Sequence, residues 1–263
     1  MEIPKHPVQQ CVRLRVFAPS PATTAWSTSP TPEDWGPGNR ILKNYLSFSF
    51  SRAVFLTERD VDQTAPSNLP LVFDDDRCLF NTGLYTRRYE TIYGLFEPNT
   101  KPDARQRWFL KGFFKESDPM LVSFEYLPCR VRFAEDPSEL VFDYRLPIRS
   151  NIDHILGDEE NLTRIPASLM GEGNSLLLRR AFEGAVVEAA RRAAANYTLA
   201  VPQFYGGRIQ LLLPLCLTGD KPELALTIQR EDGFYAARTC LTLDMAYNNA
   251  RLICRPETSW IKR

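Results

Sequence analysis

The sequence is poor in histidine and has no excess of charge of either sign. Only two of its 263 residues are histidine, and 32 Lys and Arg balance 32 Asp and Glu, so the formal net charge is zero. Proteins that bind nucleic acid mainly through phosphates usually carry a basic excess, because counterion release supplies the affinity. The balance therefore argues against a high-affinity, non-specific nucleic-acid coat, but it is compatible with a local basic groove.

Long apolar runs are also missing. The longest, Leu211 to Leu217, is far shorter than the roughly 20 residues that span a bilayer. Met1 to Gln10 lacks the apolar core of a signal peptide. With 44% hydrophobic and 11% aromatic residues, the chain can nevertheless bury a core. We therefore expect an intracellular, cytoplasmic protein that does not use a membrane as its partner.

Several chemical motifs are absent. The six cysteines form no CxxC pair and lack zinc-ligand spacing, so we expect buried thiols and no metal site. There is no Gly-rich phosphate loop, GxGxxG, HExxH or GxSxG, and no lysine-x-Asp-Gly ligase signature. These absences argue against a P-loop NTPase, a Rossmann dehydrogenase or an ordinary hydrolase, and they leave any cofactor unidentified.

The pattern along the chain predicts an irregular Pro/Ser/Thr-rich lead-in over residues 1–39 and one α+β domain over residues 40–263. A helix is expected from Ile41, and a short helix over Tyr89 to Phe96 from its i, i+3, i+4, i+7 spacing. Other short apolar segments suit strands. These are Leu71 to Phe73, Cys78 to Leu84, Trp108 to Lys115, Leu121 to Phe124 and Leu140 to Tyr144.

The last third predicts a long amphipathic helix followed by an antiparallel three-stranded meander. The helix covers about Ser175 to Tyr197, and Pro202 prevents its continuation. Strands are expected over residues 208–217, 224–228 and 234–243, with Glu231-Asp232-Gly233 as a tight turn. Asp244 then fits the N-cap of a short helix that ends near Leu252.

Seven motifs occur in an order that matches one family. They are Leu79 to Tyr85, Ile92 to Phe96, Trp108 to Phe113, Asn151 to Leu156, Pro202 to Tyr205, Ile209 to Leu215 and Leu241 to Leu252. Together they resemble the domain of unknown function numbered 3825, over residues 40–261. The resemblance implies no particular reaction. It implies an association with RNA, since related domains occur beside OST-HTH (LOTUS) and cold-shock domains.

His154 is the candidate acid or base, accompanied by Arg149 and Asp153 in a polar run. An imidazole has an ordinary pKa near 6.5, so it can exchange a proton near neutrality, as general acid–base work on a phosphodiester requires. If this run is a strand, Arg149, Asn151 and Asp153 share one face and His154 points to the other. The alternative is that His154 is a locally satisfied structural residue.

The candidate ligand-binding residues lie in other segments. Asn is a mediocre helix former, so Asn248 and Asn249 after Asp244 indicate hydrogen bonds to a ligand or to a neighbouring loop. Trp108 and Lys111 lie in a strand that alternates basic and aromatic residues, which is typical of single-strand nucleic-acid platforms but also of any half-buried strand. The remaining candidates are Asn81, Gln203, Tyr205 and Arg238.

Three functions remain open. The first is an RNA-associated domain that binds or processes RNA through a polar, basic and aromatic cleft on its sheet. The second is a phosphodiester- or nucleotide-acting enzyme, a nuclease or nucleotidyl transferase, with His154 as acid/base and Arg149, Arg238 or Lys111 stabilising developing charge. The third is a non-catalytic protein-interaction scaffold. Each functional site requires that polar residues far apart in the chain meet on the open side of the sheet.

Overall fold

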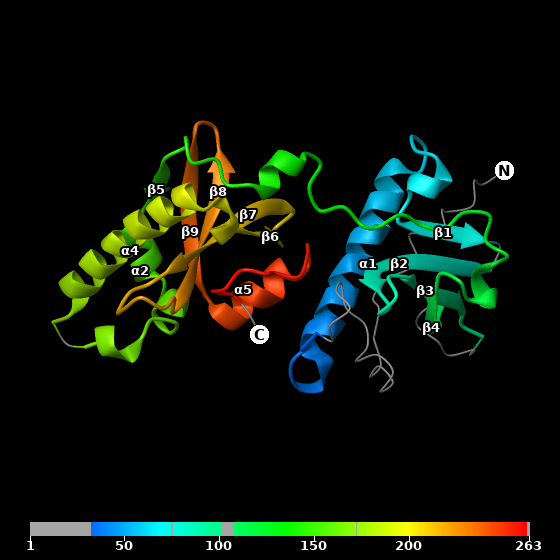
Figure 1. The fold of residues 1–263 in the computed structure, drawn as a ribbon, viewed down its shortest axis with the longest axis horizontal. Helices are drawn as coiled ribbons and strands as arrows, with labels where there is room; N and C mark the ends of the chain where they lie inside the picture. The colour runs from blue at the N-terminus through cyan, green and yellow to red at the C-terminus, as the bar shows by residue number, and fades with distance from the viewer. Residues whose placement is uncertain (1–32, 75, 101–107, 172, 262–263) are drawn as a thin grey trace. The chain divides into compact units, whose positions relative to one another are not determined.

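The computed structural model describes residues 33–74, 76–100, 108–171 and 173–261. The chain forms two compact units that divide between Arg132 and Phe133, and each unit contains one sheet and a long helix (Figure 1). The predicted α+β class is confirmed. Residues 1–32 of the predicted lead-in lie outside the described residues, and the single domain over residues 40–263 stays a prediction.

The first unit begins with a short turn, η3 (Pro37–Asn39), and the helix α1 (Arg40–Asp60), which confirms the helix predicted from Ile41. One side of α1 is apolar and buried. The ring of Phe50 on this side lies 5.4 Å from the ring of Phe80 and 5.0 Å from that of Phe96. Helix α1 therefore covers one face of the sheet that follows it.

That sheet has four antiparallel strands in the order β1-β2-β3-β4. The strands are β1 (Leu71–Asp74), β2 (Arg77–Tyr85), β3 (Thr91–Pro98) and β4 (Trp108–Lys115), with η4 (Pro66–Asn68) before them and η5 (Pro119–Leu121) after them. Leu79 and Leu95, which alternate with the residues facing α1, pack against Leu121 and Phe124. The sheet is thus covered by α1 on one face and by residues 116–131 on the other.

The helix predicted over Tyr89 to Phe96 is wrong, because β3 occupies this segment. All five residues from Ile92 to Phe96 are buried, since both faces of the sheet are covered. A strand buried on both faces shows no alternation, so its apolar residues can match a helical spacing by coincidence.

Two predicted strands are also wrong. Leu121 to Phe124 begins with the last residue of the single turn η5, and Leu140 to Tyr144 begins with the last residue of η6 (Pro137–Leu140). Each turn starts with a proline, and the preceding aspartate, Asp118 or Asp136, accepts a hydrogen bond from a backbone N–H inside the turn. Asp-Pro pairs favour such helical starts, and here they outweigh the apolar composition.

The second unit contains a five-stranded sheet in the order β5-β9-β8-β7-β6. Its elements are β5 (Ile148–Ser150), α2 (Ile152–Gly157), α3 (Glu159–Leu162), η7 (Ala167–Leu169), α4 (Ser175–Ala195), η8 (Tyr197–Leu199), β6 (Val201–Tyr205), β7 (Arg208–Leu215), β8 (Leu224–Glu231), β9 (Phe234–Thr242) and α5 (Leu243–Ala250). The long helix, the three-stranded meander and the turn at Gly233, where φ is +79°, are confirmed. Strand β6 extends the meander, and β5 pairs with β9 in parallel.

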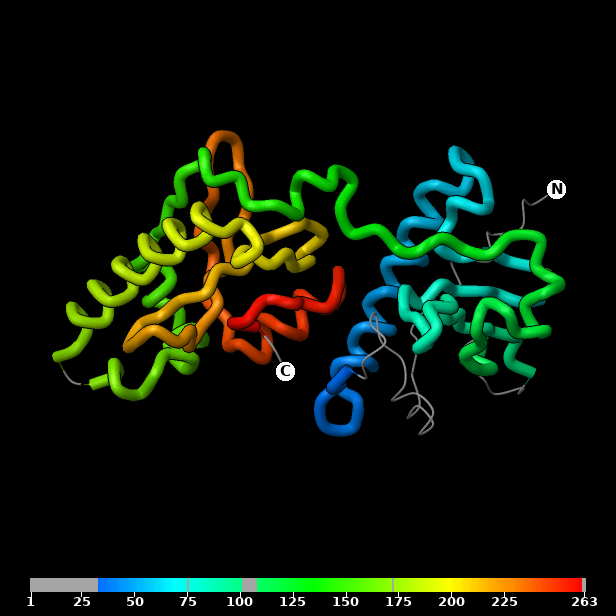
Figure 2. Tube along the Cα trace, viewed as in Figure 1, coloured from blue at the N-terminus to red at the C-terminus, as the bar shows by residue number. Residues whose placement is uncertain are grey.

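The two faces of this sheet carry different helices. Leu211 and Leu213 of β7 and Leu226 of β8 belong to one buried cluster with Leu178 and Phe182 of α4. Helix α5 lies on the other face, since it follows β9 directly and contacts β6 (Figure 2). The predicted N-cap, Asp244, is wrong by two residues. Thr242 caps α5, because its hydroxyl accepts a hydrogen bond from the backbone N–H of Met245 (3.3 Å).

A polar insertion in β2 joins three parts of the first unit. The pairing of β2 with β3 is interrupted at Thr82 and Gly83. Buried Asn81 donates from Nδ2 to the carbonyl oxygen of Pro128 (2.9 Å), and its Oδ1 accepts from the N–H of Gly83 (2.9 Å). The hydroxyl of Tyr45 on α1 donates to the carbonyl oxygen of Thr82 (2.7 Å). The insertion therefore holds α1 and the 116–131 segment against β2.

We predict that Gly83→Ala lowers the free energy of unfolding of the first unit by about 2–4 kcal/mol. Gly83 has a φ of +68°, and a Cβ atom there would lie 2.7 Å from Oη of Tyr45. The positive φ costs roughly 1 kcal/mol or more, and the overpacking adds about 1–3 kcal/mol. Urea unfolding followed by the signal of the buried aromatic residues measures this loss.

Gly233→Ala is the matched control. Gly233 has a similar φ of +79°, but no atom lies within 4 Å of its added Cβ. Gly233→Ala should lower the free energy of unfolding by about 1 kcal/mol, from backbone strain alone. Equal losses in the two variants would contradict the close approach of Tyr45 to Gly83.

Candidate functional site

A row of amide side chains crosses the second sheet on the face that carries α5. Gln203 on β6, Gln210 on β7 and Gln229 on β8 are hydrogen-bonded in sequence. Nε2 of Gln203 donates to Oε1 of Gln210 (2.8 Å), and Nε2 of Gln210 donates to Oε1 of Gln229 (3.3 Å). Gln203 is only 1% exposed. A buried amide with its bonding groups satisfied adds no desolvation penalty, so the row is a stable part of the sheet.

The row extends at both ends. Nδ2 of Asn249 on α5 donates to Oε1 of Gln203 (3.1 Å). Nε2 of Gln229 donates to Oε1 of Glu231 (2.9 Å), which also accepts from the guanidinium of Arg238. Because a carboxylate only accepts, Glu231 makes every amide in the row donate in the same direction. We call this set, from Asn249 to Glu231, the amide row.

The sheet is exposed at the end away from α5. Helix α5 starts where β9 finishes, so the turns at residues 206–207 and 232–233 lie at the opposite end of the strands. Tyr205 and Arg208 are paired there and project to the same side as Gln203 and Gln210, because side chains alternate along a strand. Tyr205 is 66% exposed and Arg208 is also exposed.

An arginine and a phenylalanine stack at the same end. The guanidinium carbon of Arg149 lies 4.3 Å from the ring centroid of Phe234. Arg149 on β5 is paired with Ala236, which is paired with Gln229 of the amide row, so all three project to one side. Arg149 is exposed and the side chain of Arg238 is 48% exposed. We call Arg149, Tyr205, Arg208, Phe234 and Arg238 the open sheet face.

The open sheet face is locally basic although the chain as a whole is neutral. The charged strand residues that project to this side are Arg149, Arg208 and Arg238, against Glu231. Three positive charges and one negative charge leave two positive charges. The surface thus offers two rings for stacking, guanidinium groups for anions, and a partly exposed amide at Gln229.

The structure brings five of the predicted site residues together on this side of the sheet: Gln203, Tyr205, Arg238, Asn249 and Arg149, the last of which was predicted as catalytic. The other two predicted residues of α5 lie on the helix that Asn249 joins to the amide row. Asp244 is exposed in the first turn of the helix, and half-buried Asn248 precedes Asn249.

His154 and Asp153 are placed elsewhere. The polar run is a strand only as far as Ser150, and α2 begins at Ile152. Asn151 caps α2, with its Oδ1 accepting from the backbone N–H of His154 (3.2 Å). Asp153 forms an ion pair with Arg179 of α4 (2.9 Å), while the side chain of His154 is exposed. Arg149 stacks on Phe234 instead, so the three predicted catalytic residues contact different neighbours.

The remaining predicted residues belong to the first unit and have structural contacts. Asn81 holds the insertion in β2. Lys111 forms an ion pair with Glu97, at a break in the β3–β4 register that interrupts the expected alternation. Trp108 is buried, and its ring lies 6.1 Å from that of Phe73.

Sequence reasoning missed Gln210, Gln229 and Phe234 as members of the site. A signal for Gln210 was present, since it interrupts an otherwise apolar strand segment, whereas Gln229 is followed by Arg230 and Glu231 and gave no such signal. A buried polar residue in such a strand needs a partner, and another glutamine on the neighbouring strand supplies it. Phe234 had no such signal, because its role depends on the parallel strand β5.

Metal-ligating side chains and the buried thiol of Cys240 can be judged from the described residues. Across these ranges, no group of three or more His, Cys, Asp or Glu side chains is arranged to hold a metal ion. Burial raises the pKa of the Cys240 thiol to about 11, so this thiol stays protonated at neutral pH. No helix in the described part of the chain has the extended apolar stretch that a bilayer crossing requires.

Residues 25–260 match the model of the family described as domain of unknown function DUF3825. The chain belongs to this family. No curated protein and no solved structure matches it. The family membership agrees with the order of motifs in the sequence and assigns no reaction, so the function has to be argued from the site itself.

We predict that Gln203→Leu lowers the free energy of unfolding of the second unit by about 2–3 kcal/mol. The leucine would leave Oε1 of Gln210 and Nδ2 of Asn249 without their present partner, and an unsatisfied buried group costs about 1–3 kcal/mol. Hydrogen exchange should increase in α5 more than in α4, because only α5 is bonded to the amide row.

Arg238→Gln is the control at the exposed end of the row. Its ion pair with Glu231 is partly exposed, so this variant should lower the free energy of unfolding by less than about 1 kcal/mol. Uniform hydrogen exchange in α4 and α5 of the Gln203→Leu variant would contradict a selective role of the row in holding α5.

Proposed function

We propose that this protein binds single-stranded RNA on the open sheet face. The observation that carries the proposal is the exposed ring of Tyr205 on the same strand-built surface as three arginines. Proteins that bind single strands combine aromatic rings, on which bases stack, with cationic groups that follow the phosphates. The open sheet face has both kinds of group within one sheet.

The geometry favours single strands over duplexes. The bases of a duplex are stacked on one another, so a ring lying on a sheet surface reaches only unstacked bases. Tyr205 and Phe234 lie on the outer strand β6 and on β9, which are separated by β7 and β8. Neighbouring strands are about 4.8 Å apart, so the two rings are roughly 14 Å apart across the sheet. A single strand crossing the sheet can therefore place different bases on the two rings.

RNA is proposed rather than DNA for two reasons. The family resemblance implies an association with RNA-binding modules, and the partly exposed Gln229 supplies an amide near the surface. An amide can both donate to and accept from a ribose 2′-hydroxyl, which DNA lacks. The same oligonucleotide sequence in DNA should therefore bind more weakly.

The proposal is binding rather than catalysis. Guanidinium, ring and amide groups recognise a ligand without transferring a proton at neutral pH. His154, the predicted acid or base, is exposed on α2, and its neighbour Asp153 is paired with Arg179. An RNA-binding role would also suit the expected cytoplasmic location, a reducing compartment in which thiols such as those of Cys78 and Cys240 persist.

We predict salt-sensitive binding of moderate strength. Two or three phosphate contacts give a slope of log K against log salt of about −1.4 to −2.1 for a single strand. Fluorescence anisotropy with a labelled RNA of about 12 nucleotides, between about 50 and 200 mM salt, measures this slope. Absence of binding even at the lowest salt would refute the proposal.

Two substitutions separate stacking from phosphate contact. Tyr205→Ala should weaken binding by about 5- to 150-fold and leave the salt slope unchanged, because base stacking contributes about 1–3 kcal/mol. Arg208→Gln should make the slope less negative by about 0.7, the contribution of one phosphate contact. Both side chains are exposed, so neither change should alter the fold.

Arg180→Gln and Arg191→Gln are matched controls. Both arginines are exposed on α4, the helix that covers the opposite face of the same sheet. They remove the same charge as Arg208→Gln and should leave affinity and slope unchanged. If these variants lost as much RNA affinity as Arg208→Gln, the attraction would be diffuse and electrostatic, with no localised site on the open sheet face.

A further inference from the structure

The first unit has a sheet edge that is open within the described chain. Strand β1 is the last strand of its sheet and has only four residues. It pairs with β2 on one side, and among the described residues no other strand pairs with it. In an antiparallel pair only alternate residues direct their N–H and C=O groups toward the partner. Every second residue of β1 therefore presents these groups to the outer side.

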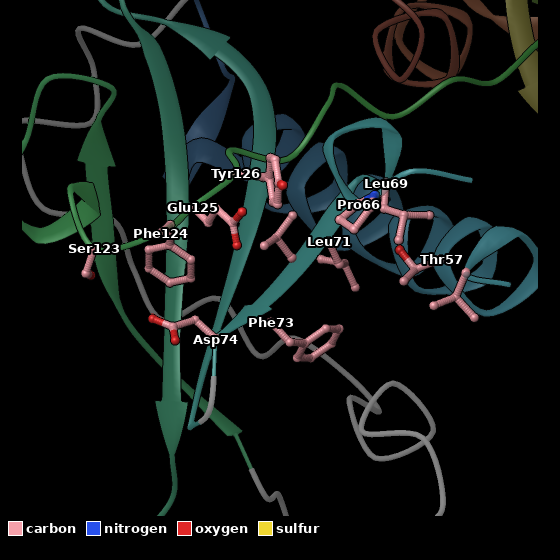
Figure 3. A pocket seen from close by; sticks show the side chains of 12 residues that line it. Thr57, Pro66, Leu69, Leu71, Phe73, Asp74, Ser123, Phe124, Glu125 and Tyr126 are labelled. Carbon is pink, nitrogen blue, oxygen red and sulfur yellow. The ribbon is translucent and has the colours of Figure 1, made fainter. Parts of the chain in front are cut away.

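A pocket of about 530 Å³ lies along this edge. Figure 3 shows Ser123 to Tyr126 on one side of it and Thr57, Pro66 and Leu69 on the other, with Leu71 and Phe73 of β1 between them. The two layers that cover the sheet, α1 and the 116–131 segment, both line the pocket. Because residues of both layers line the pocket beside an edge strand, we call this pocket the slot and compare it with the position of a fifth strand.

The two walls of the slot differ in chemistry. Leu71 and Phe73 are paired with Phe80 and Cys78 and so project to the α1 side. Together with Val61, which directly follows α1, they make this wall apolar.

The other wall is aromatic and acidic. It contains Phe124 and Tyr126 with the carboxylates of Glu125 and Asp74. Arg77 already binds there, since its guanidinium pairs with Asp74 and lies 4.6 Å from the ring centroid of Phe124. Asp74, Glu125 and Arg77 together leave one negative charge, and exposed Glu125 has no cation beside it in the pocket lining.

We propose that β1 binds an extended peptide from a partner protein, which adds to the sheet as a fifth strand. The peptide would alternate apolar residues with lysine or arginine. Side chains of an added strand point alternately to the two walls, so apolar residues meet Val61 and Leu71 while basic residues meet Glu125 and the aromatic rings. The outward N–H and C=O groups of β1 supply the main-chain hydrogen bonds.

The unpaired edge of β1 favours the addition of a further strand. An exposed strand edge tends to recruit other strands, and proteins protect such edges by short length or by a covering layer. Here β1 is short, which limits non-specific pairing, but the slot beside it leaves room for one further strand. Selectivity would then come from the slot, since a peptide without the alternation places charge against the apolar wall.

The test uses the whole protein and a labelled seven-residue peptide that alternates lysine and valine. We expect saturable binding by fluorescence anisotropy, with slower hydrogen exchange of the backbone amides of residues 71–74. A peptide that alternates glutamate and valine should bind at least about tenfold more weakly, because its carboxylates would face Glu125. Equal binding of both peptides, or binding without protection of β1, would refute strand addition.

Main-chain pairing is tested without altering the protein. Two forms of the lysine–valine peptide are N-methylated at alternate residues, one on the odd and one on the even positions. Strand addition requires that one form loses binding by about tenfold or more while the other retains it, because only alternate N–H groups face β1. Similar affinities of the two forms would show side-chain docking alone and overturn the proposal.

Glu125→Lys tests the acidic wall, with Glu257→Lys as its control. Both glutamates are exposed, and Glu257 lies in the second unit. Only the Glu125 variant should lose affinity for the lysine–valine peptide and gain affinity for the glutamate–valine peptide. This exchange of preference cannot arise from unfolding, since an unfolded variant would bind neither. Stabilisation by small apolar compounds without any peptide binding would instead indicate a small-molecule pocket.

Discussion

The hydrogen-bond row that ends at Glu231 is the constraint on which the candidate site depends. Its amides could point either way if they stood alone, because an amide has a donor and an acceptor end. The carboxylate removes this freedom, since it can only accept, and Arg238 holds it in place. The donor direction fixed at Glu231 therefore also fixes the orientation of each glutamine amide and of Asn249. Asn249 in turn holds α5 at one end of the sheet. The other end of the same face is left exposed, and there the rings and arginines are found.

How much of the fold could be predicted depended on how many faces of each element are covered. Helices α1 and α4 each bury one stripe, so their spacing was readable in the sequence. The hairpin between β8 and β9 was readable from its Asp232-Gly233 turn. Strand β3 was misread because its sheet is covered on both faces, which removes alternation. The short turns after Asp118 and Asp136 were missed because capping outweighed composition.

The candidate site was predicted only in part, for a different physical reason. Gln203 was singled out beside the Gly206-Gly207 turn and Asn249 as a poor helix former inside a helix, yet the bond between them joins positions 46 residues apart. No local pattern encodes such a pair. His154, Arg149 and Asp153 are close in sequence, but the cap at Asn151 turns the chain from strand to helix and separates their side chains. Proximity in the chain was therefore a poor guide here, and the polarity of Gln210 inside an apolar strand was a useful signal that was not used.

The zero net charge of the chain is the sum of opposite local charges, and this bears on what each surface can bind. The open sheet face carries two positive charges in excess, and the slot beside β1 carries one negative charge in excess. Phosphates are repelled by Glu125, and a basic peptide is repelled by Arg149 and Arg208. The charges that favour each proposed ligand at its own surface therefore disfavour it at the other. A neutral composition argues against a uniform coat of nucleic acid, but it is what two selective surfaces of opposite sign would produce.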